Sequence, residues 1–187
     1  MRLSDTPTVE VVERLACSPE QAWALVTDIE LPTRADGELQ RVEWLDGAIG
    51  VAVGARFRGY NANPHMGEWQ TESEIVEVED GRRWVWCVGS VETPLAVWGF
   101  EVEPGRDGTV VRQWAKVGTG RSPLTEFIEQ HPDKEGAIVA HRMSVWRDGM
   151  AANLAMLADL AASRVRPPMT PARSRPSRGA DARPGRL

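Results

Sequence analysis

Cysteine, tyrosine and long apolar runs are all scarce in this chain of 187 residues. The two cysteines, Cys17 and Cys87, have no partner at CxxC or zinc-ligand spacing, so the sequence predicts buried thiols and no metal site. No segment approaches the roughly 18 apolar residues of a membrane span, and the opening MRLSDTPTVE lacks the apolar stretch of a secretion signal. These absences predict a cytoplasmic protein with no membrane span and no metal or redox cofactor.

Basic residues are unevenly placed. Residues 166–187 contain six Arg and one Asp, which leaves sixteen basic and twenty-six acidic side chains in residues 1–165. An acidic body lacks the clustered Lys and Arg that phosphate contacts need, so we expect no nucleic-acid partner. The tail is rich in Arg and Pro and has almost nothing to bury, which predicts a disordered segment after one domain over residues 1–165. Contact of this tail with RNA or an acidic partner is the alternative to a solvated terminus.

Alternating apolar and polar residues predict about seven strands. They cover approximately residues 8–16, 39–46, 55–63, 68–79, 82–89, 94–103 and 109–117. The first strand carries an irregularity at Val11 and Val12, where two apolar residues adjoin. Asp80-Gly81 is a strong two-residue hairpin signal, which predicts that the strands on either side of it pair antiparallel.

Helical signals lie after the first strand and after the last. Ser18 followed by Pro19 is typical of a helix start, and this helix ends before Pro32. A break at residues 131–133 precedes one long amphipathic helix that ends near Val165. One strand, two short helices, six strands and a long helix predict an α+β fold, in which a curved antiparallel sheet wraps around the long C-terminal helix.

Tryptophan is the residue that the chain has in excess, with eight Trp against one Tyr and three Phe. Trp69, Trp84, Trp86 and Trp98 fall at inward positions of the predicted strands. Such a set either fills a core or lines a ligand cavity. Small residues on the facing helix, such as Gly149, favour the cavity because they leave space opposite the rings.

Four polar side chains share the inward face of the sheet. Burying a polar group without a hydrogen bond costs about 1–3 kcal/mol, so each of them either joins an internal network with water or contacts a ligand. The four are Asn61, Thr71, Ser73 and Gln113.

His141 and Arg142 lie beside the apolar stripe of the long helix, and one of the two must face nearly inward. An inward Arg could hold a carboxylate, enolate or phenolate, and an inward His could move a proton near neutral pH. The alternative is a surface Arg paired with Asp148 or Glu135 beside an ordinary His.

Three segments of the chain resemble one known family. They are VERLACSPEQAWALVTDIELPTRADGELQRVEWL, GEWQTESEIVEVEDGRRWVWCV and VGTGRSPLTEFIEQHPDKEGAIVAHRMSVWRDGMAANLAMLADLA. The resemblance is to the SRPBCC or START-like superfamily, and within it to the polyketide cyclase and dehydrase-like proteins of actinobacteria. It covers about residues 8–163 and implies a helix-grip fold, with a ligand site between the concave sheet and the long helix. It does not fix a reaction, because one fold serves many functions.

The resemblance and the inward residues together suggest a cofactor-independent cyclase, aromatase or dehydratase of secondary metabolism, such as antibiotic biosynthesis. Aromatic walls would hold one folded conformer of a hydrophobic substrate, while polar groups polarise its carbonyls and His141 or water transfers protons. The catalytic candidates are His141, Arg142, Gln113 and Asn61. The substrate-binding candidates are Phe57, Trp69, Thr71, Ser73, Trp84, Trp86, Trp98 and Val145.

Two other functions stay open at this point. A non-catalytic carrier or sensor of a hydrophobic small molecule needs the same cavity without groups for proton transfer. A chaperone-activating or protein-interaction member of the superfamily needs an exposed apolar patch instead, and we rank it last. The sequence leaves a homodimer open.

Overall fold

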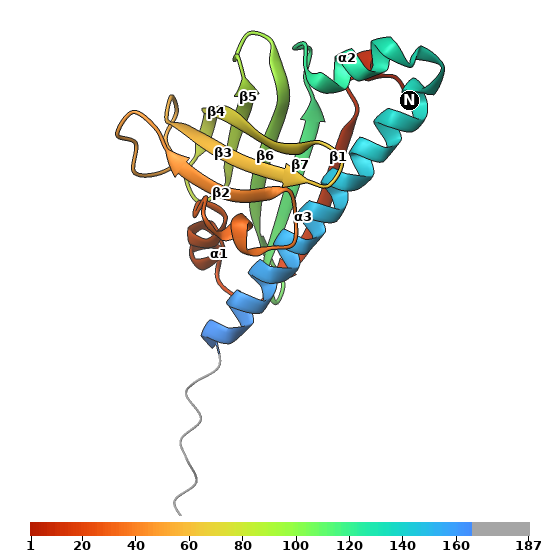
Figure 1. Ribbon diagram of the computed structural model, residues 1–187. Helices are drawn as coiled ribbons and strands as arrows, with labels where there is room; N and C mark the ends of the chain where they lie inside the picture. The colour runs from red at the N-terminus through yellow and green to blue at the C-terminus, as the bar shows by residue number, and fades with distance from the viewer. Residues whose placement is uncertain (166–187) are drawn as a thin grey trace, which may run out of the picture.

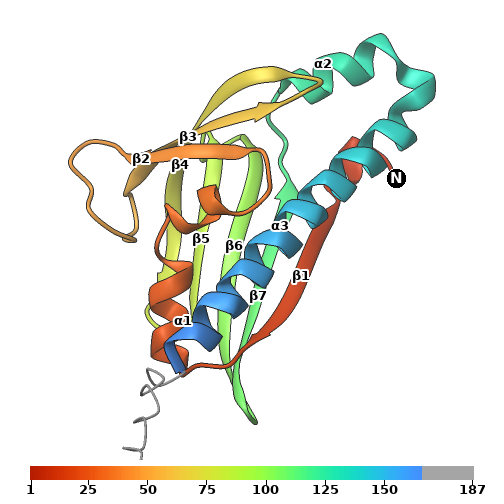
Figure 2. The same ribbon diagram turned by 60° about the horizontal axis from the view of Figure 1, so that its bottom comes forward.

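The computed structural model describes residues 1–165, so the expected disordered tail over 166–187 lies outside the described residues. Seven strands form one antiparallel sheet in the order β1-β7-β6-β5-β4-β3-β2. The sheet curls, and the long helix α3 runs diagonally along its open side (Figures 1 and 2). The strands are β1 (Thr8–Leu15), β2 (Leu39–Trp44), β3 (Arg56–Asn63), β4 (Gly67–Glu79), β5 (Arg83–Gly89), β6 (Pro94–Gly105) and β7 (Gly108–Val117).

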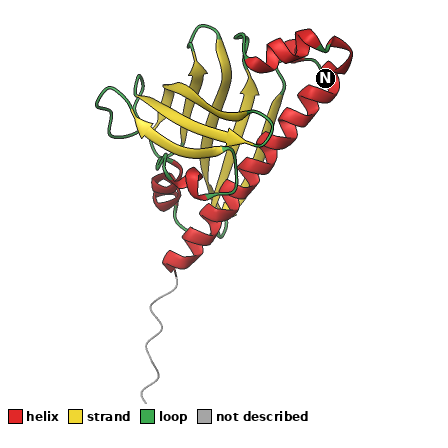
Figure 3. Cartoon of the chain, viewed as in Figure 1, coloured by secondary structure: helices red, strands yellow, loops and turns green. Residues whose placement is uncertain are grey.

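The helices lie where the sequence predicts them (Figure 3). Between β1 and β2 come α1 (Pro19–Val26) and the short 3-10 turn η2 (Leu31–Arg34). Ser18 and Gln21 exchange side-chain and backbone hydrogen bonds at the start of α1, which satisfies two free backbone N–H groups there. The remaining elements are η1 (Leu3–Asp5), α2 (Pro123–Gln130), η3 (Pro132–Lys134) and α3 (Glu135–Val165). The predicted α+β helix-grip fold is therefore confirmed.

The long helix α3 is held by one apolar face, which packs mainly on β1 and also contacts β7. Its buried residues recur every three or four positions, as expected for a helix of 3.6 residues per turn. They are Val139, Met143, Met150, Leu154, Leu157 and Ala161. None of the described helices is both long and apolar enough to span a bilayer.

The predicted irregularity in β1 is wrong. The strand pairs with β7 without a shift from Thr8 opposite Lys116 to Leu15 opposite Thr109. Val12 simply points outward and is 52% exposed, because an edge strand needs no bulge to carry one apolar residue on its solvent side.

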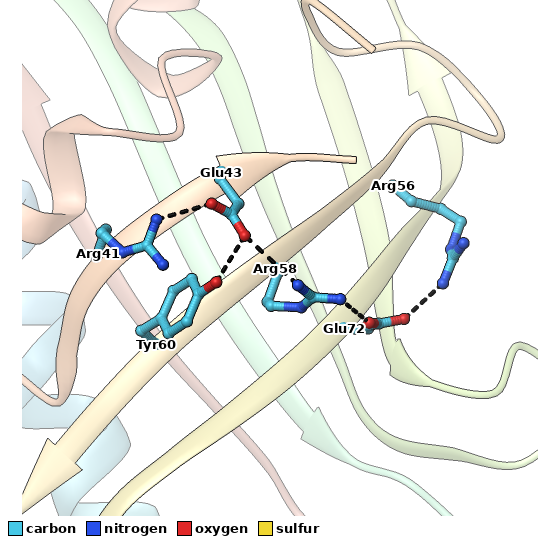
Figure 4. Close-up of polar contacts among 6 residues, drawn as sticks. All are labelled: Arg41, Glu43, Arg56, Arg58, Tyr60 and Glu72. Atoms are coloured by element: carbon cyan, nitrogen blue, oxygen red, sulfur yellow. Dashed lines mark hydrogen bonds and ion pairs between the residues drawn. The ribbon is translucent and has the colours of Figure 1, made fainter. Parts of the chain in front are cut away.

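Charged residues cover the convex side of the sheet, which faces away from α3. On β2, β3 and β4 they form a continuous chain of contacts (Figure 4). Glu43 accepts hydrogen bonds from Tyr60 at 2.6 Å and from Arg41 at 2.7 Å, and these partners lower the pKa of its carboxyl. Glu72 binds Arg58 at 2.6 Å, and this contact holds the pKa of the Glu72 carboxyl below its usual value.

A single glycine allows a tryptophan to lie flat on the same convex side. A Cβ atom at Gly99 would fall 2.6 Å from the ring of Trp114, so only glycine leaves room for this ring. The guanidinium of Arg83 lies 5.6 Å from the centre of the same ring, within cation–π range. Trp114 thus points outward, as its place in the alternation predicts.

Candidate functional site

Four aromatic rings cross the concave side of the sheet and reach α3. We call them the aromatic row: Phe57 on β3, Trp86 on β5, Trp98 on β6 and Trp146 on α3. Their successive ring centres are 6.1, 6.2 and 5.0 Å apart, which is the separation of interacting aromatic pairs. The register explains the order, since Trp86 and Trp98 are direct partners across β5 and β6.

The rings of the row differ in burial. Phe57 is buried in the core, whereas Trp86, Trp98 and Trp146 are only half-buried. Solvent therefore reaches the indole side chains on the inner side of the fold. A half-buried row of flat rings is the surface that an aromatic or conjugated ligand stacks on.

Trp84 is a core residue and does not line the ligand face, which corrects the expectation for this side chain. It is 2% exposed, and its indole N–H donates to the carbonyl of Val26 in α1 at 3.1 Å. Its ring stacks on Trp86 at 4.4 Å and on Phe100 at 5.9 Å. Trp84 therefore packs in the core against Trp86, one ring of the aromatic row.

Two amides meet beneath the row, between β7 and α3. Asn153 and Gln113 are 3% and 7% exposed, and the Asn153 amide N–H donates to Gln113 Oε1 at 3.0 Å. The other oxygen, Asn153 Oδ1, is buried and meets no donor among residues 1–165. The structure thus places Gln113 at an inward position, as the alternation predicts, and adds a partner that the sequence reasoning did not single out.

The remaining inward polar residues lie on β3 and β4. Asn61 sits opposite Trp69 in the register and donates to Thr71 Oγ1 at 3.4 Å, which is a long hydrogen bond. Asn61, Thr71 and Trp69 are half-buried, and Ser73 is 3% exposed. These four residues share one face but lie toward the β2 edge, and β5 and β6 separate their strands from Gln113 on β7.

Arg142 is the inward member of the helix pair. It binds Glu38, in the loop before β2, at 2.8 Å, and Glu38 also accepts a hydrogen bond from Asn63 at 2.7 Å. The guanidinium lies 5.2 Å from the ring centre of Trp146, so the ion pair stands beside the last ring of the row. This bridge joins α3 to the opposite edge of the sheet.

Two expectations for this part of α3 need correction. His141 is exposed, because it lies a third of a turn from Arg142 around the helix, and so it points away from the aromatic row. Arg142 does not pair with Asp148 or Glu135, since the side chain of Glu135 accepts the backbone N–H of Leu3 at 2.9 Å. Val145, a substrate-binding candidate, is half-buried.

Two hollows lie away from the aromatic row. One of about 370 Å³ is bounded by α1 and the loop after β2, including Trp23 and Ile49. Another of about 200 Å³ is on the charged side of the sheet, next to Arg83 and Glu101. Neither hollow is lined by a residue of the aromatic row, so an enclosed cavity at the aromatic row stays a prediction. Across residues 1–165, no three His, Cys, Asp or Glu side chains gather to share a metal ion.

A curled antiparallel sheet that grips a long helix, with half-buried rings between the two, defines a helix-grip domain. The family profile described as "Polyketide cyclase / dehydrase and lipid transport" matches residues 6–161. The chain therefore belongs to this family, and the resemblance found in the sequence is confirmed. A search of curated proteins found no match.

Solved structures of similar fold support this assignment. A Polyketide_cyc-like protein, Cgl2372 from Corynebacterium glutamicum, aligns at 24% identity and a TM-score of 0.59, over 88% of this chain and 95% of its own. The di-domain ARO/CYC protein BexL of the BE-7585A biosynthetic pathway aligns at 14% identity and a TM-score of 0.65, over 88% of this chain and 53% of its own. StfQ, a di-domain ARO/CYC protein of the steffimycin pathway, aligns at 16% identity and a TM-score of 0.61, over 84% and 51%. At these identities the similarity shows the fold.

Two residues of the site were not predicted as site residues. Asn153 is an amide in a helical stretch otherwise made of Ala, Leu and Met, and Asn is a weak helix former. This contrast indicates that Asn153 makes a polar contact in the protein interior. Glu38 carried no such signal, because acids are common in loops and its partner Arg142 is 104 residues away.

Proposed function

We propose that the protein is a cofactor-independent cyclase, aromatase or dehydratase of secondary metabolism that binds a hydrophobic or aromatic small molecule on the aromatic row. The observation that carries the proposal is the line of half-buried rings Trp86, Trp98 and Trp146, which runs from the sheet onto α3. A core alone would bury these rings, as it buries Trp84. Flat indole surfaces that solvent reaches favour a stacked conjugated ligand.

The chemistry would depend mainly on positioning. A flexible poly-β-ketone stacked on the row has few conformers left, which brings a nucleophilic carbon and a carbonyl carbon together. The amides of Gln113 and Asn61 and the guanidinium of Arg142 would polarise carbonyl oxygens toward the enolate. Aldol closure then forms one C–C bond, the alkoxide takes a proton, and loss of water leaves a double bond. With His141 exposed, ordered water is the proton carrier in this scheme.

The test is turnover of a reactive poly-β-ketone, followed by chromatography of the products. Wild type should shift the products toward one cyclised compound, and Gln113→Ala and Arg142→Ala should reduce that shift about tenfold or more. Arg147→Ala is the matched control, because Arg147 is an exposed arginine on the same helix. Identical products with wild type, with all variants and without protein would refute the catalytic function.

A non-catalytic carrier or sensor is the second candidate, and the Arg142–Glu38 ion pair favours it. This pair engages the inward Arg142, so its guanidinium is not free to polarise a carbonyl unless the pair opens. If the protein is a carrier, binding of 2-naphthol should quench the fluorescence of Trp86 and Trp98, and a poly-β-ketone should stay unchanged. Turnover above the background rate would decide for the enzyme.

We also propose a cytoplasmic location and a function without nucleic acid, on the acidic composition of residues 1–165. The oligomeric state, including the homodimer left open by the sequence, is measurable by light scattering coupled to gel filtration.

A further inference from the structure

The pair Gln113 and Asn153 leaves hydrogen-bonding capacity unused in a buried place. Each side-chain amide offers an N–H₂ donor and a carbonyl acceptor. The pair makes one mutual hydrogen bond of 3.0 Å, and within residues 1–165 neither Gln113 Nε2 nor Asn153 Oδ1 meets another partner. One donor and one acceptor therefore remain.

This result does not depend on how the amide nitrogens and oxygens are assigned. If both amides are turned over, Gln113 donates to Asn153, and again one N–H₂ group and one carbonyl oxygen are left. Burial of the Asn153 carbonyl oxygen without a partner costs about 1–3 kcal/mol, so a domain that needed only a core would carry an apolar side chain at this position. Their neighbours in the fold are apolar, including the rings of Phe100 and Trp84 on β6 and β5.

A way to the pair exists along α3. Gly149 lies one turn before Asn153 on the same side of the helix, and a Cβ built at Gly149 meets no atom within 4 Å. The same side of the helix carries Trp146 and Arg142, the last ring of the row and the bridge to Glu38. The free space at Gly149 therefore lies on the side of α3 that carries both the last ring of the row and Asn153.

We propose that Gln113 and Asn153 form a subsite for a hydroxyl group of the ligand, a phenol or an enol, reached through the space beside Gly149. A hydroxyl is both a donor and an acceptor, so a single one satisfies Asn153 Oδ1 and Gln113 Nε2 together. A ketone or an ether can only accept and leaves the carbonyl oxygen unpaired. The subsite rests on the proposed function, since it presupposes a ligand on the aromatic row, and it narrows the ligand to hydroxylated or enolised aromatic compounds.

The experiment compares two probes that share one ring system. 2-Naphthol carries a hydroxyl, and 2-methoxynaphthalene carries an oxygen that only accepts. Isothermal titration calorimetry should give wild type a Kd about tenfold lower for 2-naphthol than for 2-methoxynaphthalene, which corresponds to one or two net hydrogen bonds. The double variant Gln113→Leu/Asn153→Leu removes both amides, so no amide is left without its partner. It should therefore fold and bind the two probes equally.

Two further variants separate the subsite from the rest of the site. Gly149→Leu fills the approach and should weaken both probes about tenfold or more, and the absence of neighbouring atoms predicts that it folds. Gln70→Leu removes an exposed amide from β4 and should leave the preference for 2-naphthol unchanged.

The outcomes distinguish the two proposals. Equal affinity for both probes in wild type overturns the subsite and leaves the ligand-binding row intact, with water as the partner of the amides. A preference for 2-naphthol that persists in the double variant overturns the assignment to Gln113 and Asn153. No binding of either probe overturns the aromatic row as a ligand site, and the subsite with it. Unchanged binding by Gly149→Leu overturns the approach beside Gly149.

Discussion

The two sides of the sheet use their polar groups in opposite ways. On the convex side, Glu43, Glu72 and Glu101 each bind two or more partners on neighbouring strands, and the charges neutralise one another. On the concave side, the rings are half-buried and the amides of Gln113 and Asn153 keep a free donor and a free acceptor. The charged groups of the convex side are thus paired with one another, although the buried indole N–H of Trp114 meets no acceptor within residues 1–165. The concave side differs in that its half-buried rings and a buried carbonyl oxygen are left for another molecule.

The largest effect should come from Trp84, the inward ring that is fully buried in the core rather than half-buried. Trp84→Ala should lower the free energy of unfolding by about 3–5 kcal/mol, because it empties a large core volume and removes the hydrogen bond to Val26. Urea unfolding followed by circular dichroism measures the loss. Trp69→Ala, at a half-buried position on the same face, is the control and should cost clearly less. Equal losses would contradict the division between core and ligand rings.

On the convex side, Gly99→Ala should destabilise the fold by about 1–3 kcal/mol. The new methyl group would overlap the ring of Trp114, which also lies next to the guanidinium of Arg83. Thermal unfolding of the single variant and of Gly99→Ala/Trp114→Ala tests the reason. The double variant should regain the part of the stability that Gly99→Ala loses through the clash with the ring. If the loss is unchanged, the clash with Trp114 is not its cause.

On the concave side, Gly149→Ala should stabilise the protein by about 0.5–1 kcal/mol. Alanine is the better helix former, and no atom stands within 4 Å of the new Cβ. The midpoint of urea unfolding should rise without a change in slope. A loss of stability would mean that the space beside the helix is already filled, and the approach to the amide pair would be excluded as well.

The smallest effect should be that of a convex ion pair. Arg58 lowers the pKa of Glu72, so this pair stabilises the fold above the ordinary carboxyl pKa of about 4.3 and loses that contribution as the pH falls through the lowered value. The difference in stability between wild type and Glu72→Gln should therefore be small at pH 7 and vanish on further acidification. Salt should reduce it too. Glu68→Gln, also exposed on β4 but without an ion pair among the described residues, is the matched control for the loss of one surface charge.

The fold was predictable because its signals are local. Alternation gives the strands and their inward residues, and the sequence around Ser18 and Pro19 gives the start of α1. Burial of Trp84 was not predictable in the same way, since a strand residue that faces inward can meet either a ligand or a helix, and here it meets the backbone of α1. Alternation does not predict which part of the concave face α1 and α3 cover.

The polar part of the site was less predictable, because its contacts join distant segments. Inward positions for Gln113 and Arg142 follow from periodicity. Their partners Asn153 and Glu38 depend on how α3 crosses the sheet, and periodicity fixes neither the crossing nor the rotation of the helix. The same limit applies to His141, whose exposure follows only once α3 is docked.

The strand order also predicts the order in which the elements fold. β1 is made first, yet its only partner in the sheet is β7, and Thr8 cannot pair with Lys116 until the six later strands exist. Pairing between such distant segments is slow, so the meander from β2 to β7 should form ahead of the closure by β1. α3 packs mainly on β1 and must follow it. The aromatic row and the amide pair, which both need α3, are therefore the last parts of the molecule to be assembled during synthesis and the first to be lost when the helix detaches.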